Sequence, residues 1–381
     1  MRSVYLDFNA TTPLDPRVLE AMSPFLTGEF GNPSSIHHIG RTARAALDEC
    51  RYRVAHLWSC KPSEVIFTSG GTESNNLAII GAARSKASKG RHLITSAVEH
   101  HAVLHCFQNL ARSEGFDLTI LPVSSTGLID PADLEKAIRP ETTLVSIMAA
   151  NNETGTIQSL SEVSRLCHKH GILFHSDAVQ AFGKLPFSQM GQFGADLVSV
   201  CAHKFFGPKG IGALYCRSPL LLPPLFRGGA QENESRPGTE NLPSIVGFTE
   251  ASELFVPKPI FDPAALAPLS QHLIDSLIAL PGIRFQGHPT ARLPNTAAFT
   301  VDGWDSISLL AALDLEGICA SSGSACSVGS LEPSHVLLAM GLSVEEANSL
   351  VRFSLGPKTS LEEIDYTIDV FQQILGNRTD L

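Results

Sequence analysis

The chain of 381 residues lacks the features that mark membrane-spanning and exported proteins. It has no run of 18 consecutive apolar residues, because even its most apolar stretch, residues 220–226, is interrupted by Pro223 and Pro224. Its N-terminus carries no long apolar segment before the first acidic residue, Asp7, and so does not resemble a signal peptide. We therefore expect no membrane association and a location in the cytoplasm.

Basic residues are scarce as well. Lys and Arg number 28 against 38 Asp and Glu, which gives a formal net charge of -10 at pH 7. The chain also has no local run of basic residues, so nucleic acid is not expected as a direct partner. Apolar residues make up 43% of the chain, well above the proportion found in disordered sequences. The length and composition predict two or three folded units with an extensive core.

The cysteines form no Cys-x-x-Cys pair and no Cys/His spacing typical of structural zinc, so we predict no metal site. Their scatter fits a reducing compartment, where most would be small buried apolar side chains. The eight cysteines are Cys50, Cys60, Cys106, Cys167, Cys201, Cys216, Cys319 and Cys326.

Short apolar segments alternate with amphipathic ones between residues 60 and 215, a pattern typical of β-α units around a mostly parallel sheet. Asp130 and Pro131 indicate the start of a helix over residues 132–138, and Ser161 is expected to cap a helix that ends at Gly171. The predicted strands are residues 65–67, 93–95, 118–123, 144–148, 172–175, 197–200 and 212–215.

A proline-containing stretch over residues 256–268 marks a boundary, after which residues 269–280 are predicted to form a helix. We expect an α/β protein with a large, mostly parallel-sheet domain over residues 13–257. A smaller α+β domain would combine residues 1–12 with residues 258–381. No internal repeat or low-complexity tract is present, which excludes a solenoid.

The first predicted strand is followed by a glycine turn. Paired glycines at Gly70 and Gly71 let main-chain amides approach an anion at the start of the next helix, with Thr72 beside them. The segment lacks the lysine of a P-loop and the third glycine of a dinucleotide fingerprint, which argues against ATP and NAD. We interpret it as a phosphate cradle, and a purely structural turn is the alternative.

Titratable side chains follow three further predicted strands, at the edge where an open α/β sheet binds its ligands. His100 could stack on a ring or move a proton, although a satisfied structural histidine would look the same. Asp177 ends a buried strand, with Gln180 three residues later, and a helix cap is the alternative for the carboxylate. Lys204 stands between a buried strand and a rigid glycine-proline turn. A desolvated amine there can form a Schiff base with an aldehyde, and a lysine that reaches solvent is the competing reading.

Together, the cradle, imidazole, carboxylate and amine supply what pyridoxal phosphate needs: anchorage, stacking, a charge at the ring nitrogen and covalent attachment. Two later features complete the set. Cys326 lies in a Gly/Ser-rich loop that could present its thiol to a ligand or could be a plain linker. Arg352 lies in an apolar stretch, where it could grip a substrate carboxylate or form a structural ion pair.

Taken in order, these motifs resemble the cysteine desulfurases, in the class V aminotransferase group of fold-type I pyridoxal phosphate enzymes. The loop that runs on to His335 resembles the longer-loop subgroup, which includes nitrogenase-associated and housekeeping iron-sulfur enzymes. The matching segments are residues 5–13, 31–35, 69–76, 99–100, 151–153, 177–180, 203–204, 236–239 and 322–326.

The resemblance implies a role for each candidate residue. Lys204 would hold the cofactor covalently and take the Cα proton, Asp177 would pair with the ring nitrogen, and His100 would stack on the ring. The other cofactor contacts would be Asn152 and Gln180 at the ring hydroxyl, and Gly71, Thr72, His203 and, from a second subunit of a homodimer, Thr239 at the phosphate.

On the substrate side, the resemblance implies that Arg352 holds the carboxylate of L-cysteine, with Asn32 as a further contact. Cys326 would take the sulfur as a persulfide and pass it to an iron-sulfur scaffold or another acceptor protein, while L-alanine is released. Cys201 stands where the family usually places a phosphate-binding serine, and a thiol donates a weaker hydrogen bond. A selenocysteine lyase and a non-catalytic scaffold protein are the alternatives.

Overall fold

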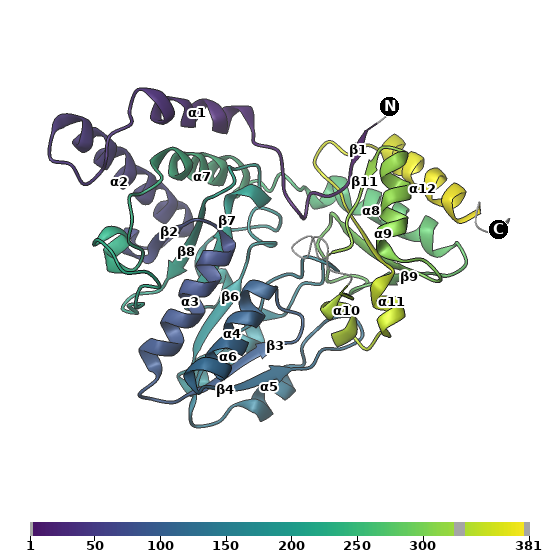
Figure 1. Ribbon diagram of the computed structural model, residues 1–381, viewed down its shortest axis with the longest axis horizontal. Helices are drawn as coiled ribbons and strands as arrows, with labels where there is room; N and C mark the ends of the chain where they lie inside the picture. The colour runs from purple at the N-terminus through teal and green to yellow at the C-terminus, as the bar shows by residue number, and fades with distance from the viewer. Residues whose placement is uncertain (1–2, 324–331, 377–381) are drawn as a thin grey trace.

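The computed structural model describes residues 3–323 and 332–376, and its largest element is a seven-stranded sheet (Figure 1). β8 runs antiparallel to both of its neighbours, and the other strands pair in parallel. All seven predicted strands are present, which confirms the α/β class with a mostly parallel sheet. In spatial order the strands are β2 (Val65–Thr68), β8 (Gly212–Cys216), β7 (Leu197–Cys201), β6 (Leu173–Asp177), β5 (Thr142–Ser146), β3 (His92–Ser96) and β4 (Asp117–Leu121).

Helices cover both faces of this sheet, because successive side chains of a strand point to opposite faces. On one face Phe67 packs against Phe248, and on the other Ile66 belongs to a cluster with Leu77 and Phe107. The helices of this part are α1 (Pro16–Thr27), α2 (His38–Trp58), α3 (Gly71–Lys86), α4 (His101–Glu114), α5 (Pro131–Ala137), α6 (Leu160–His170) and α7 (Leu242–Phe255), with short turns η1 (Pro62–Glu64), η2 (Met190–Phe193), η3 (Ala202–Lys204) and η4 (Gln231–Glu234).

Helix starts were predicted with mixed success. α5 begins at Pro131, and the Asp130 carboxylate accepts a hydrogen bond from the amide of Ala132 at 2.8 Å, as expected. α6 ends at His170 with Gly171 as its C-terminal cap, close to the expected end, but it begins at Leu160, so the prediction that Ser161 caps it is wrong. Ser161 lies inside the first turn, because the buried stripe of the helix, rather than a hydroxyl cap, fixes this end.

The C-terminal part contains a second, antiparallel sheet and a parallel strand pair that the N-terminus joins (Figure 1). Val4 pairs with Ile318, which brings the first residues beside the C-terminal helices. The elements are β12 (Leu350–Ser354), β10 (Thr296–Val301) and β9 (Ile283–Gln286); β1 (Val4–Tyr5) and β11 (Ile318–Cys319); and α8 (Pro263–Ile278), α9 (Ser306–Leu315), α10 (His335–Ala339), α11 (Val344–Asn348) and α12 (Leu361–Gly376).

The start predicted for the helix after the boundary, residue 269, is wrong. α8 begins at Pro263, where the Asp262 carboxylate accepts from the amide of Ala264 at 3.0 Å, and Pro268 lies within the helix. The Asp-Pro pair is the same start signal as at α5. None of the helices in residues 3–323 and 332–376 is long and apolar enough to cross a membrane.

Candidate active site

A cavity of about 330 Å³ opens at the ends of β2, β3, β5, β6 and β7, where the sequence placed its candidate residues. The strands bring together side chains that are far apart in the chain, because parallel strands end at one edge of the sheet. The predicted residues that line this cavity are Gly71, Thr72, His100, Asn152, Asp177, Gln180, Cys201, His203, Lys204 and Arg352.

One end of the cavity is formed by the N-terminus of α3. Gly70 has a φ of 151°, which only glycine adopts freely, and it places Gly71 at the cavity wall. A Cβ on Gly71 would lie 2.8 Å from a methyl group of Val179, so the close approach requires glycine. The Cys201 thiol lies beside this turn, and burial raises its pKa to about 11, so it is a neutral group. The helix start is thus a cradle suited to an anion.

Asp177 supplies a buried carboxylate at the end of β6. One oxygen accepts a hydrogen bond from the side-chain amide of Asn75 at 2.6 Å, and the other accepts from the amide of Val179 at 3.0 Å. The residue is 5% exposed and lines the cavity. The carboxylate therefore organises the turn after β6, and it does not cap a helix as the alternative supposed, because no helix begins there among the described residues.

His100 caps α4 and lines the cavity at the same time. Its Nδ1 accepts a hydrogen bond from the amide of Ala102 at 3.0 Å. Burial lowers the pKa of His100, an effect that the charge of Asp177 opposes, so the ring is neutral at pH 7. With Nδ1 accepting, a neutral imidazole carries its proton on Nε2.

Lys204 ends the short turn η3 and faces the N-terminal segment. Its Nζ donates to the carbonyl oxygens of Asn9 at 2.6 Å and Ala10 at 2.7 Å. The preceding residue, His203, has its pKa lowered to about 4 by burial and, to a lesser degree, by the charge of Lys204. A neutral imidazole and a primary amine therefore stand together on the cavity wall.

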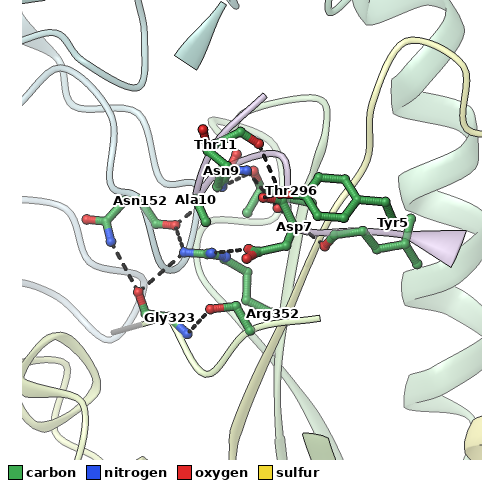
Figure 2. A network of polar contacts seen from close by, with 12 residues as sticks. Tyr5, Asp7, Asn9, Ala10, Thr11, Asn152, Thr296, Gly323 and Arg352 are labelled. Carbon is green, nitrogen blue, oxygen red and sulfur yellow. Dashed lines mark hydrogen bonds and ion pairs between the residues drawn. The ribbon is translucent and has the colours of Figure 1, made fainter. Parts of the chain in front are cut away.

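Arg352 is 1% exposed and already engaged within the chain (Figure 2). Its guanidinium forms an ion pair with Asp7 at 2.6 Å and donates to the carbonyl of Asn152 at 2.7 Å and that of Gly323 at 3.4 Å. The structural ion pair weighed as the alternative is therefore present. Its Nε is buried and has no hydrogen-bond partner within the described residues, so the group retains an unused donor.

Two predicted site residues do not line this cavity, and a third cannot be placed. Thr239 and Asn32 are both exposed and do not line it, and the side-chain oxygen of Asn32 accepts a hydrogen bond from the amide of Ser34. Cys326 lies outside the described residues. The roles expected for these three side chains stay predictions.

Several residues on the wall were not singled out from the sequence. Asn9 is 1% exposed, and its carbonyl oxygen accepts a hydrogen bond from Lys204. The side-chain amide of Asn75 donates one to Asp177. Glu153, also buried on the wall, accepts a hydrogen bond from Ser334 at 2.5 Å. Asn9 and Glu153 do lie in recognised segments, residues 5–13 and 151–153, but only tertiary contacts reveal what their side chains do.

The arrangement fits a flat ring that carries a phosphate, a basic nitrogen and an aldehyde. The helix start offers amides to the phosphate, Asp177 offers a carboxylate to the nitrogen, and Lys204 offers an amine to the aldehyde. Asn75 Oδ1, like Arg352 Nε, is a buried atom of the wall without a partner in the described residues, which a ligand can satisfy. Among residues 3–323 and 332–376 no three His, Cys, Asp or Glu side chains are placed to hold a metal ion.

Comparison with known proteins agrees with this arrangement. Residues 4–367 match the family model of the class-V aminotransferases. Cysteine desulfurase IscS of Dictyoglomus turgidum is 48% identical over 375 residues, which are 98% of this chain and 95% of the relative. A solved NifS-like protein is 38% identical with a TM-score of 0.91, over 98% of this chain and 100% of its own. SspA, solved in complex with cysteine, is 36% identical with a TM-score of 0.81, over 94% of this chain and 100% of its own.

These matches confirm the predicted enzyme class, a pyridoxal phosphate-dependent sulfurtransferase, and the predicted cofactor. They cover nearly the whole chain, and identities of 48% and 38% indicate a shared family as well as a shared fold. The chain belongs to the class-V aminotransferase family and, within it, to the cysteine desulfurases.

Proposed function

We propose that the chain takes the sulfur of L-cysteine as a persulfide on Cys326 and releases L-alanine. The observation that carries this proposal is the meeting of Lys204, Asp177 and His100 with Arg352 around one cavity. An amine, a carboxylate and an imidazole serve the cofactor, and a buried guanidinium serves an amino acid carboxylate. A related protein of the same fold has been solved with cysteine, which supports this substrate.

The cofactor would be held from three sides. Main-chain amides at Gly71 and Thr72, with His203, would bind its phosphate, and Asp177 would keep its ring nitrogen protonated. Asn152 and Gln180 would contact the ring hydroxyl, and His100 would cover the ring face. When bound, pyridoxal phosphate supplies an electron sink for the charge left by loss of the Cα proton.

Lys204 would move that proton. Its Nζ rests on the carbonyls of Asn9 and Ala10, which stabilise a protonated amine and so support transfer of a proton to this atom. Arg352 would bind the substrate carboxylate through its unused Nε, and through Nη2 where it now meets Asp7. Because the carboxylate would compete with Asp7, substrate binding and the internal ion pair are coupled.

Cys326 would accept the sulfur. Gly323, which precedes the undescribed part of this loop, lines the cavity, and its carbonyl accepts from Asn152 and Arg352. Those contacts fix one end of the segment that carries the thiol. Cys326 would take the sulfur from a cavity-bound substrate and later pass it to an acceptor protein.

Mass spectrometry of the purified enzyme after L-cysteine tests the proposal. We expect one added sulfur atom on Cys326 and an equivalent amount of L-alanine. Cys326→Ala should retain the absorption band of the bound cofactor but form no persulfide, whereas Lys204→Ala should make no alanine. Selenocysteine turnover that survives Cys326→Ala, without cysteine turnover, would contradict the proposal and favour a selenocysteine lyase.

The partners are part of the same proposal. We propose a homodimer in which Thr239 reaches the phosphate of the neighbouring subunit, because this residue is exposed and lies off its own cavity. Sedimentation equilibrium would show a dimer, and Thr239→Ala should weaken cofactor binding. The sulfur acceptor would be an iron-sulfur scaffold or another cytoplasmic acceptor, identified by incubating the persulfide form with each candidate and following the labelled sulfur.

A further inference from the structure

Lys184 is a fully buried lysine that the proposed chemistry does not use. It lies in the turn after β6, four residues beyond Gln180 of the cavity wall. Its Nζ donates to the side-chain oxygen of Gln180 at 2.7 Å and to that of Asn9 at 2.6 Å, and it lies 5.1 Å from the ring centroid of Phe261. Burying an amine costs free energy, so we asked which function of the site offsets the cost of burying Lys184.

Its chemistry fixes the orientation of its neighbours. A protonated amine has three N–H donors and no acceptor, so it can meet only the oxygen of a neighbouring amide favourably, and a neutral amine still has two N–H bonds with which to donate. In the structure the Gln180 oxygen faces Lys184. The nitrogen of the same amide then points the other way, and it donates to the Asn9 carbonyl at 2.9 Å.

Gln180 depends on this contact more than Asn9 does. Within the described residues the Gln180 side chain makes two hydrogen bonds, one to Asn9 and one from Lys184. Asn9 is also held by Ser354 and Thr296, at 2.9 Å each. Removing Lys184 would leave Asn9 in place and would free the buried oxygen of Gln180.

We propose that Lys184 is a positioning residue, which acts through Gln180 by keeping the nitrogen of that amide, a hydrogen-bond donor, on the cavity wall. The Gln180 nitrogen carries two hydrogens, of which the Asn9 carbonyl takes one. The other can be donated to an oxygen of the ligand. The inference rests on the proposed cofactor site, because the ring hydroxyl is the oxygen that Gln180 would meet.

The charged and titratable groups that face Lys184 are consistent with this role. Burial, followed by the charges of Lys204 and Arg352, lowers the pKa of Lys184 well below its usual value, while Cys201 and Asp7 act in the opposite direction. Gln180 and Asn9 offer neutral oxygens. Both hydrogen bonds persist if the amine loses its proton, so the positioning does not depend on the charge.

A double-mutant cycle on cofactor binding tests the proposal. The dissociation constant of pyridoxal phosphate is measured for four proteins freed of cofactor: the wild type, Lys184→Met, Gln180→Met and the double variant. We expect Lys184→Met to raise it about tenfold, the scale of one hydrogen bond to a charged or buried partner. In the Gln180→Met background the same substitution should change it less than about twofold, because the residue through which it acts is gone.

A structural role would give a different pattern. Lys184→Met would then weaken cofactor binding by the same factor in both backgrounds, and that result would overturn the proposal. So would unchanged binding in Lys184→Met. Lys136→Met, which removes an exposed lysine, is the matched control and should leave the constant unchanged. A wild-type chain that binds no pyridoxal phosphate would instead refute the proposed function.

If Lys184→Met does not fold, Gln180→Glu supplies the test. Glutamate keeps an oxygen for Lys184 but replaces the donor nitrogen with a second acceptor. We expect it to weaken cofactor binding at least as much as Gln180→Met does. Wild-type affinity in Gln180→Glu would overturn the proposal, because a donor at this position would then be irrelevant.

Discussion

At the scale of single residues, the large sheet contains a histidine that serves the fold. His175 is fully buried in β6, between the hydroxyl of Ser146 at 2.8 Å and that of Ser199 at 3.0 Å. Burial lowers its pKa to about 3. The ring thus links three adjacent strands, β5, β6 and β7, as a neutral group.

His175 should make stability depend on acid. In the unfolded chain its pKa is near 6.5, so between pH 6.5 and pH 3 the unfolded state binds a proton that the folded state does not. The free energy of unfolding therefore falls as the pH falls through this window, by about 1.4 kcal/mol per pH unit where only one state is protonated. Urea unfolding at a series of pH values measures the slope.

His175→Gln should flatten that slope, whatever its effect at pH 7. His38→Gln, at an exposed histidine, is the control and should leave the slope unchanged. An identical slope in His175→Gln would show that other groups carry the acid sensitivity.

At the scale of elements, the turn after β6 is fitted to the turn after β7. Gly183 has a φ of 79°, and a Cβ there would lie 2.6 Å from the Cβ of Phe205, the residue next to Lys204. Gly171 has a φ of 66° but open space around it. The two glycines therefore separate the cost of a left-handed backbone from the cost of a steric clash.

Gly171→Ala should lose about 1 kcal/mol of unfolding free energy, from backbone strain alone. Gly183→Ala should lose about 2–5 kcal/mol, because overpacking adds to the strain. It should also shift the absorption band of the bound cofactor, since Phe205 must move and Lys204 adjoins it. Urea unfolding and absorption spectra of the two variants measure these effects, and equal losses with unchanged spectra would contradict the fit.

The elements also show which signals the sequence contains. The strands could be predicted because buried parallel strands leave short apolar segments, and α5 because Asp130 and Pro131 mark its start. Asp262 and Pro263 give the same signal, but they lie in a proline-containing stretch that was interpreted as a boundary. The start of α8 was therefore predicted after its true position. Ser161 misled because a hydroxyl near a helix start caps it only in the right register.

At the scale of the whole molecule, the N-terminal segment joins parts of the chain that no local pattern connects. Asn9 alone contacts Gln180 and Lys184 on one side and Thr296 and Ser354 on the other. The strand-end residues of the site were predictable, since their position follows from sheet topology. Asn9 was not, because its contacts with Gln180 and Lys184 cross more than 170 residues of sequence. The local contact of Lys184 with Gln180 gave no signal either, because only the fold shows that this lysine is buried.

The ion pair between Asp7 and Arg352 spans the same junction and yields a prediction about substrate binding. Asp7→Asn removes the charge that balances a guanidinium with 1% exposure. The free enzyme should lose about 3 kcal/mol of unfolding free energy, because the buried charge is left uncompensated. Asp302→Asn, which breaks an exposed pair with Arg284, is the control and should lose less than about 1 kcal/mol.

The binding of L-cysteine should improve in Asp7→Asn, although the stability of the protein falls. If the substrate carboxylate takes the place of Asp7 on the guanidinium, Asp7→Asn removes a competitor, and the KM for L-cysteine should fall. Steady-state alanine formation measures KM, and urea unfolding measures stability. A raised KM with an unchanged kcat would mean that Asp7 aims the guanidinium at the substrate rather than competing for it. That result would contradict the competition between Asp7 and the substrate carboxylate for Arg352.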